Sequence, residues 1–242
     1  MLNSLKHKIK EWIYAIIPPP ATNDSFSQAG EDCCIDFLFS QLKVRKPSYL
    51  ELGVCTPKYA SNTYKFYKKG SIGVLVEADK TLIDKIKQER KEDTILPFGV
   101  GVNEQEEADF YVFEVSAHNT FNKQEAEYRQ KNGSFKLLRI EKVKLVPVNT
   151  ILKNYFNGSY PDFLSIDIEG LDLAVLKSID YEKYPIPVIC AETCAYSENH
   201  IKPKDKSIEE LMVSRDYFVY ADTYINTIFV NKTWFHSAKQ KK

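Results

Sequence analysis

The chain has 242 residues with 33 basic and 33 acidic side chains, so its formal net charge is zero. Hydrophobic residues make up 43% and charged residues 27%, which is ordinary for a globular protein and excludes an intrinsically disordered chain. The balanced charge excludes a dedicated nucleic-acid binder, which needs a basic excess to neutralise phosphates, so we expect no nucleic-acid partner. The length suits one large α/β domain.

The first 20 residues read as a segment of their own. Apolar residues recur at helical spacing from Leu2 to Ile17, lysines occupy the other face, and Pro18 to Pro20 end the helix. We therefore divide the chain into an amphipathic helix with its proline stop, residues 1–20, and a main domain, residues 21–242. Two interpretations stay open: residues 1–17 make a peripheral membrane contact, or they pack on the domain or on a second subunit.

The cellular setting is inferred from the cysteines and the hydropathy. Five cysteines are an odd number, which disfavours the disulfide framework of a secreted protein. No stretch reaches the roughly 20 apolar residues of a membrane span. We expect a cytoplasmic protein, placed at the inner membrane surface if the N-terminal helix binds there.

The rest of the chain alternates between strand-like and helical runs. A helix at 29–42 comes first, and the central part predicts strands at 49–54, 73–76, 94–100, 163–168 and 188–191, separated by helices at 61–69, 81–90, 150–156 and 172–179. A helix at 208–214 precedes an antiparallel pair, 217–221 and 227–230. This alternation predicts an α/β fold with a mostly parallel sheet and helices on both faces.

One insertion interrupts the alternation. Residues 110–115 and 142–148 predict an accessory β pair, and the polar residues between them, 116–141, predict a mobile insertion. Long insertions of this kind often form a substrate lid. Surface decoration without a function is the alternative.

Acidic side chains follow most of the predicted parallel strands. In open α/β sheets, ligands bind beyond the carboxyl ends of the strands. Paired glycines, Gly99 and Gly101, follow the third strand, and carboxylates follow the other four: Glu51, Glu77, Asp167 with Glu169, and Glu192. Capping of the following helices explains an acid such as Asp172, but not a carboxylate at four strand ends.

The spacing favours a nucleoside cofactor that lacks a pyrophosphate. Gly53 permits a sharp turn after the first strand, and Glu77 at the end of the second strand suits a ribose diol. A dinucleotide fold would also need G-x-G-x-x-G, but Cys55 and Lys58 stand where the later glycines would be. S-adenosylmethionine needs the ribose acid without the pyrophosphate cradle.

Several motifs resemble those of the FkbM family of methyltransferases. They are S-Q-A-G-E-D at 27–32, E-L-G-V at 51–54, S-N-T at 61–63, F-Y-K-K-G at 66–70, V-E-A-D at 76–79 and S-I-D-I-E-G at 165–170. The resemblance spans about residues 26–231. It implies a class I methyltransferase, a Rossmann-like fold with a seven-stranded sheet ordered 3-2-1-4-5-7-6, S-adenosylmethionine as cofactor, and methylation of hydroxyl oxygens on sugars or polyketides. Cys55 and Pro57 depart from the glycines of the wider class.

The resemblance and the strand ends together assign roles to the site residues. For the cofactor we expect Glu51 and Gly53 at the methionine, Glu77 at the ribose and Val100 at the adenine, with further contacts from Asn62, Ala78, Gly99, Gly101 and Asp167. The candidate bases for catalysis are Asp167, Glu169 and His118, because an alcohol needs a positioned base. Asn119 and Glu192 are expected to bind substrate. No ligand spacing demands a metal, and we assign none.

The sequence thus predicts an O-methyltransferase that acts on a hydroxyl of a glycan, a sugar or a related polar small molecule. Two alternatives belong to other classes. One is a nicotinamide-dependent Rossmann oxidoreductase, which the missing glycines disfavour. The other is a non-catalytic scaffold, which would have no need of acids at the strand ends.

Overall fold

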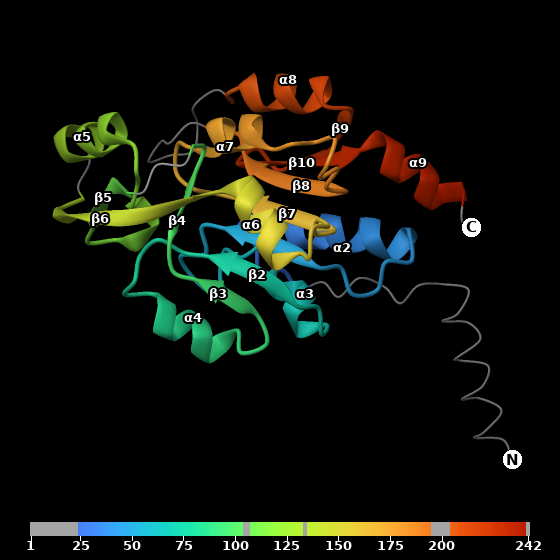
Figure 1. Cartoon of the computed structure of the whole chain (residues 1–242), viewed down its shortest axis with the longest axis horizontal. Coiled ribbons are helices and arrows are strands. Elements are labelled where there is room, and N and C mark those ends of the chain that lie inside the picture. Colours follow the sequence, from blue (N-terminus) through green and yellow to red (C-terminus); the bar gives the residue numbers. More distant parts are fainter. Residues whose placement is uncertain (1–23, 104–106, 133–134, 195–203, 241–242) are drawn as a thin grey trace, which may run out of the picture.

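Seven strands form the main sheet of the computed structural model, which describes residues 24–103, 107–132, 135–194 and 204–240 (Figure 1). The strands are β1 (Tyr49–Leu52), β2 (Gly73–Val76), β3 (Thr94–Leu96), β7 (Phe163–Ile166), β8 (Val188–Glu192), β9 (Tyr217–Asp222) and β10 (Asn226–Asn231). Their order is β3-β2-β1-β7-β8-β10-β9. Numbered along the chain within this sheet, the order is 3-2-1-4-5-7-6, and the predicted fold class is confirmed.

The sheet is parallel from β3 to β8, and β10 runs antiparallel to both of its neighbours. Strands β1 and β7 lie at its centre and every residue in them is buried, because helices cover both faces. Successive side chains point to opposite faces, so Leu50 joins one hydrophobic core and Tyr49 joins the other.

Different helices pack against the two cores. The core around Leu50 packs against α6 (Val148–Tyr155), α7 (Asp172–Ser178) and α8 (Ser207–Ser214). The core around Tyr49 packs against α2 (Glu31–Gln41), α3 (Tyr64–Lys68), α4 (Ile83–Glu89) and α9 (Lys232–Gln240). Except for α9, each of these helices was predicted, and its ends lie within one or two residues of the predicted ends. The one larger difference is that α3 starts three residues later than predicted.

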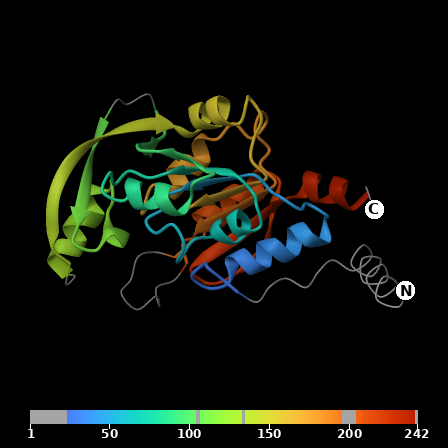
Figure 2. The same cartoon turned by 90° about the horizontal axis from the view of Figure 1, so that it is seen from below.

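A second sheet of three strands stands at one end of the molecule, where a curved ribbon projects with a helix beside it (Figure 2). Its order is β4-β6-β5, from β4 (Gly99–Gly101), β6 (Leu137–Pro147) and β5 (Glu107–Phe113). Strands β5 and β6 are antiparallel, which confirms the accessory pair. The insertion holds the 3-10 turn η1 (Ser116–His118) and α5 (Lys123–Asn132), and its last residues belong to β6.

The structure differs from the sequence-based expectation in two places. The expected third strand, 94–100, is split: β3 ends at Leu96, and residues 99–101 pair with β6 instead. Pro97 lies at the break and has no N–H for the ladder. Helix α9, for which no helix was expected, follows β10 because Trp234, Phe235 and Ala238 pack on the second core.

Several expectations concern the N-terminus and the cysteines. The N-terminal helix and the domain division at residue 20 lie outside the described residues and stay predictions. Within the described ranges, no helix has the length and apolar character that crossing a bilayer requires. The five cysteines are free thiols.

Candidate functional site

A cavity of about 200 Å³ opens at the carboxyl ends of β1, β2 and β7. Most of the predicted cofactor residues line it: Glu51, Gly53, Asn62, Glu77, Ala78, Gly99, Val100 and Asp167. Two of the predicted catalytic and substrate residues, Glu169 and Asn119, also line it. Gly101, His118 and Glu192 are not part of its wall. Residues that lie far apart in the sequence therefore meet at the carboxyl ends of these strands.

Gly53 makes the sharp turn that brings the β1 loop against β7. Its φ is +83°, and a Cβ built on it would lie 1.9 Å from the backbone oxygen of Asp167. No other residue fits this approach. Cys55, which replaces a glycine of the wider class, also has a positive φ of 48°. The loop thus keeps a glycine-like shape at Cys55 despite the different residue.

Glu77 is buried at the end of β2 and binds the same loop. Its Oε2 accepts hydrogen bonds from the backbone N–H groups of Cys55 (2.8 Å) and Val54 (3.1 Å), and its Oε1 accepts from Asp79 N (2.7 Å). Burial raises the pKa of Glu77, and these N–H donors oppose that rise. A carboxylate has about four acceptor positions, so capacity remains for a hydroxyl donor from a ligand.

Asp79, the second acid after β2, has a different task. Its Oδ1 accepts from the backbone and hydroxyl of Thr81, at 2.9 and 2.7 Å, in the turn before α4. Its Oδ2 accepts from Asn119 Nδ2 at 2.9 Å, while Asn119 Oδ1 accepts from Phe113 N at 2.8 Å. Both ends of the Asn119 amide therefore fix the insertion to β2 and β5. Its predicted contact with substrate stays a prediction.

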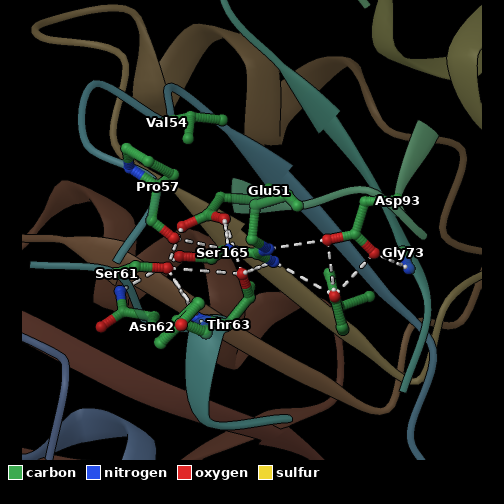
Figure 3. Close-up of polar contacts among 12 residues, drawn as sticks. Glu51, Val54, Pro57, Ser61, Asn62, Thr63, Gly73, Asp93 and Ser165 are labelled. Carbon is green, nitrogen blue, oxygen red and sulfur yellow. Dashed lines mark hydrogen bonds and ion pairs between the residues drawn. The ribbon is translucent and has the colours of Figure 1, made fainter. Parts of the chain in front are cut away.

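Glu51 and the S-N-T element form a polar network under the cavity (Figure 3). Glu51 accepts hydrogen bonds from the hydroxyls of Thr63 (2.6 Å) and Ser61 (3.1 Å). Ser61 Oγ also accepts from Tyr64 N at the start of α3, and Asn62 Nδ2 donates to Ser165 Oγ on β7. The hydroxyls of S-N-T thus hold the loop, whereas Asn62 lines the cavity.

Arg90 completes this network from the far end of α4. It is fully buried and donates to Thr63 Oγ1 (2.9 Å), Asp93 Oδ2 (2.8 Å) and the backbone oxygen of Pro57 (3.1 Å), and its Nη1 lies 3.8 Å from Glu51 Oε2. Burial raises the pKa of Glu51, and the Arg90 charge opposes that rise. The loop from Gly53 to Thr63 is therefore held in place from behind.

Part of the cavity lining is apolar. Phe98, Val100, Phe110, Phe121 and Leu82 form it, which is the surface that an adenine ring requires. A Cβ on Gly99 would lie 2.5 Å from Phe121 Cζ, so glycine is needed there for packing. Gly101 lies beyond the wall, next to Leu145.

Carboxyl groups concentrate beyond β7 and β8. Asp167 is hydrogen-bonded to Glu192; burial raises the pKa of Asp167, and this hydrogen bond opposes the rise. Burial, and after it the charge of Asp167, raises the pKa of Glu192 to about 11 and that of Glu169 to about 8. Burial likewise raises the pKa of Asp172 to about 7. At neutral pH this cluster holds protons that exposed carboxyl groups would release.

The insertion reaches the cluster through Arg129 of α5. Arg129 Nη2 contacts Glu169 Oε2 at 2.6 Å, and Arg129 Nη1 donates to the backbone oxygen of His118. The His118 ring itself packs on Phe135, with ring centroids 3.8 Å apart, outside the cavity wall. The role of His118 as a base stays a prediction.

Sequence reasoning missed many of the residues that build the site, and Gln28 and Arg129 are two polar examples. Gln28 lines the cavity, and its signal was available because it belongs to the S-Q-A-G-E-D motif. Arg129 had no signal, because its partner Glu169 is 40 residues away and no motif contains the arginine. Among the residues that the structure describes, no group of three or more His, Cys, Asp or Glu side chains is arranged to hold a metal ion.

The comparison with family models decides the class of protein. Residues 51–219 match the methyltransferase FkbM domain. The chain belongs to the FkbM methyltransferase family. It is an S-adenosylmethionine-dependent methyltransferase, which replaces the oxidoreductase and scaffold alternatives.

The comparison with solved structures finds methyltransferases at low sequence identity. A putative O-methyltransferase from Klebsiella pneumoniae has 10% identity, covers 93% of this chain and 96% of its own, and gives a TM-score of 0.41. An O-methyltransferase from Bacillus cereus in complex with SAH has 12% identity, coverage of 93% and 97%, and a TM-score of 0.41. A putative RNA methyltransferase from Pyrococcus horikoshii has 11% identity, coverage of 90% and 95%, and the same score. No curated protein matches the chain.

The residues of the cavity fit the cofactor of the FkbM methyltransferases. The aromatic and aliphatic lining residues suit the adenine, and the buried Glu77 suits the ribose hydroxyls. S-adenosylmethionine carries positive charge on its sulfonium and its ammonium, and Glu51 and Asp167 line the remaining part of the cavity. The cavity-lining residues are thus complementary to S-adenosylmethionine in polarity and in charge.

Proposed function

We propose that this methyltransferase acts on a hydroxyl oxygen of a sugar, a glycan or a related polar small molecule. The observation that carries the proposal is the group of carboxyl side chains at the end of β7, where Asp167 and Glu169 line the cofactor cavity. Carboxylates accept hydrogen bonds from hydroxyl groups and also accept protons from them. A polyol acceptor offers several such hydroxyls.

The chain's own residues divide the work between binding and proton transfer. Glu77 holds the ribose, Glu51 and Gly53 border the methionine, and Val100 contacts the adenine. The bound cofactor supplies an electrophilic methyl group. Asp167 and Glu169 orient the acceptor hydroxyl and take its proton, because an alcohol oxygen is a weak nucleophile until a base removes that proton. Glu192 keeps a proton on its own carboxyl and shares it with Asp167.

The test is methyl transfer from labelled S-adenosylmethionine to a panel of neutral sugars and glycans, with amine and carboxylate acceptors in parallel. We expect label on a hydroxyl oxygen, and a loss of about 10²- to 10⁴-fold in kcat for Asp167→Asn. The control is Asp109→Asn, an exposed acid on β5 that pairs with Lys142.

Calorimetry with S-adenosylhomocysteine separates the two roles of Asp167. Lost turnover with retained affinity assigns Asp167 to the acceptor, and loss of both assigns it to the cofactor. Full activity of Asp167→Asn excludes it as the essential base, and transfer only to nitrogen or carboxylate acceptors contradicts the proposed substrate class.

A further inference from the structure

Helix α5 buries an arginine although its sequence is almost entirely polar. Only Ala126 and Arg129 of this helix are buried, and Arg129 has no exposed surface. Its guanidinium contacts Glu169 Oε2 at 2.6 Å and Glu125 Oε1 at 2.9 Å. Burying a charge costs free energy unless it is paired, so these contacts explain why the arginine lies inside.

Further contacts fasten the same segment to the D-x-E-G motif. Thr120 Oγ1 donates to the backbone oxygen of Glu169 at 2.8 Å. A Cβ on Gly170 would lie 2.9 Å from Glu125 Oε2, so glycine permits the close approach of α5. Glu169 itself has a positive φ of 55°. The backbone at Glu169 is therefore held in an uncommon conformation where the insertion meets it.

This docking brings the insertion to the cofactor cavity. Ser116, Ala117, Asn119 and Phe121 line the cavity together with Glu169. Arg129 thus lies behind a carboxylate that faces the cavity, and behind the loop that forms one of its walls.

The charges around Glu169 come from every element packed against it, and most are acidic. Arg129 supplies positive charge, and the titratable neighbours are acids and a thiol: Asp167 after β7, Glu125 on α5, Glu192 at the end of β8, Cys55 in the β1 loop and, next to Asp167, Asp172 on α7. Burial and Asp167 raise the pKa of Glu169 to about 8, while Arg129 lowers it. Removal of Arg129 takes away the positive charge that Glu169 contacts directly.

We propose that Arg129 is a positioning residue of this enzyme: its guanidinium orients the Glu169 carboxyl group at the cavity and favours its ionised form, and it ties residues 116–132 to the strand end that carries Glu169. The inference rests on the proposed function, in which Glu169 is one of the groups that accept the hydroxyl proton. An ionised Glu169 is the form that can accept the proton. Arg129 therefore acts through Glu169 without contacting the acceptor.

The experiment follows the titration of Glu169 directly, in the full chain and without an acceptor. Glutamate carboxyl carbons are labelled with ¹³C, and the Glu169 signal is assigned with Glu169→Gln. We expect Arg129→Met to raise the titration midpoint by at least one pH unit, and Arg129→Lys, which keeps the charge but loses the fork, to raise it less. Lys123→Met removes an exposed positive charge from the same helix and should leave the midpoint unchanged.

Activity then gives a second readout. The rate rises with pH as the base ionises, so the rising limb of kcat/KM should move to higher pH in Arg129→Met by the same amount as the Glu169 midpoint. An unchanged midpoint in a folded Arg129→Met overturns the proposal.

If Arg129→Met does not fold, two milder variants test the proposal through the same Glu169 midpoint. Arg129→Lys should raise the midpoint, and Glu125→Gln, which removes a repelling carboxylate and a competitor for the guanidinium, should lower it; no shift in both overturns the proposal. A different outcome is that the Arg129 variants shift the Glu169 midpoint while Glu169→Gln keeps full activity. That result would contradict only the proposed role of Glu169 as a base.

Discussion

At the residue scale, Glu77 shows how one carboxylate serves both the fold and the ligand. It accepts three backbone N–H bonds, from Val54, Cys55 and Asp79, and it lines the cavity. The ligand-binding loop is therefore preorganised by the acid that we assign to the ribose. Preorganisation of this kind reduces the free-energy cost of ordering the loop on binding.

Substitution of Glu77 should consequently weaken cofactor binding. Glu77→Gln keeps the shape but replaces an anionic acceptor with a neutral amide, and hydrogen bonds to charged groups are worth about 1.5–3 kcal/mol. We expect the Kd for S-adenosylhomocysteine, measured by calorimetry, to rise about 10- to 100-fold. Glu89→Gln on the exposed side of α4 is the control, and equal affinities for wild type and Glu77→Gln would refute the ribose assignment.

At the scale of elements, the β1–α3 loop depends on a helix that follows it in the chain. Arg90, just after α4, donates to Pro57 O and Thr63 Oγ1 beside Glu51. It also lies over the rings of Tyr49 and Tyr67, at 5.5 and 4.9 Å. The loop that builds the cofactor cavity is thus fixed by tertiary contacts as well as by its own glycine.

Removal of Arg90 should therefore destabilise the domain. Arg90→Met leaves Asp93 and Glu51 buried without their cation, and loss of one partner of a buried pair costs about 3–5 kcal/mol. Urea unfolding measures this change, and S-adenosylhomocysteine affinity should fall as well because the loop is released. Lys58→Met breaks the exposed Lys58–Glu89 pair near the same helix and should leave stability unchanged. If Arg90→Met keeps wild-type stability and wild-type affinity for S-adenosylhomocysteine, the loop does not depend on Arg90 for its conformation.

At the scale of the whole molecule, the strand order accumulates negative charge at one edge. The parallel strands β1, β2, β7 and β8 all end on the same side, so their terminal carboxyl groups converge. Folding buries them, and burial raises the pKa values of Glu51, Glu77 and Asp167, and those of Glu169 and Glu192 to about 8 and about 11. Burial also raises the pKa of Asp172, at the start of α7, to about 7.

The raised pKa values predict how stability depends on pH. In the unfolded chain these carboxyl groups release their protons near pH 4, whereas in the folded chain they retain them up to about pH 7 and above. The folded state therefore binds more protons, and stability falls as pH rises from about 4 through 8. We expect a lower Tm at pH 9 than at pH 6 without cofactor, and a smaller fall in Glu169→Gln. A Tm that rises over this range would contradict the acid cluster.

Much of the architecture could be predicted because its signals are local. The seven strands of the main sheet and most helices follow from apolar runs and periodicity, and Gly53 and Glu77 follow from their positions at strand ends. The split third strand shows the limit of that reasoning. Pro97 was visible, but the change of partner from the main sheet to β6 depends on a strand more than 40 residues later.

The sequence by itself determined the family, the cofactor class and the acids that gather at the sheet edge, because motifs and strand ends are properties of short segments. Only the tertiary structure decided which carboxylates form hydrogen bonds or ion pairs with other side chains of the protein. It engaged Glu51 with Ser61, Thr63 and Arg90, and Glu169 with Arg129. Those pairings depend on how distant elements pack, and packing is set by the whole core instead of by any local pattern.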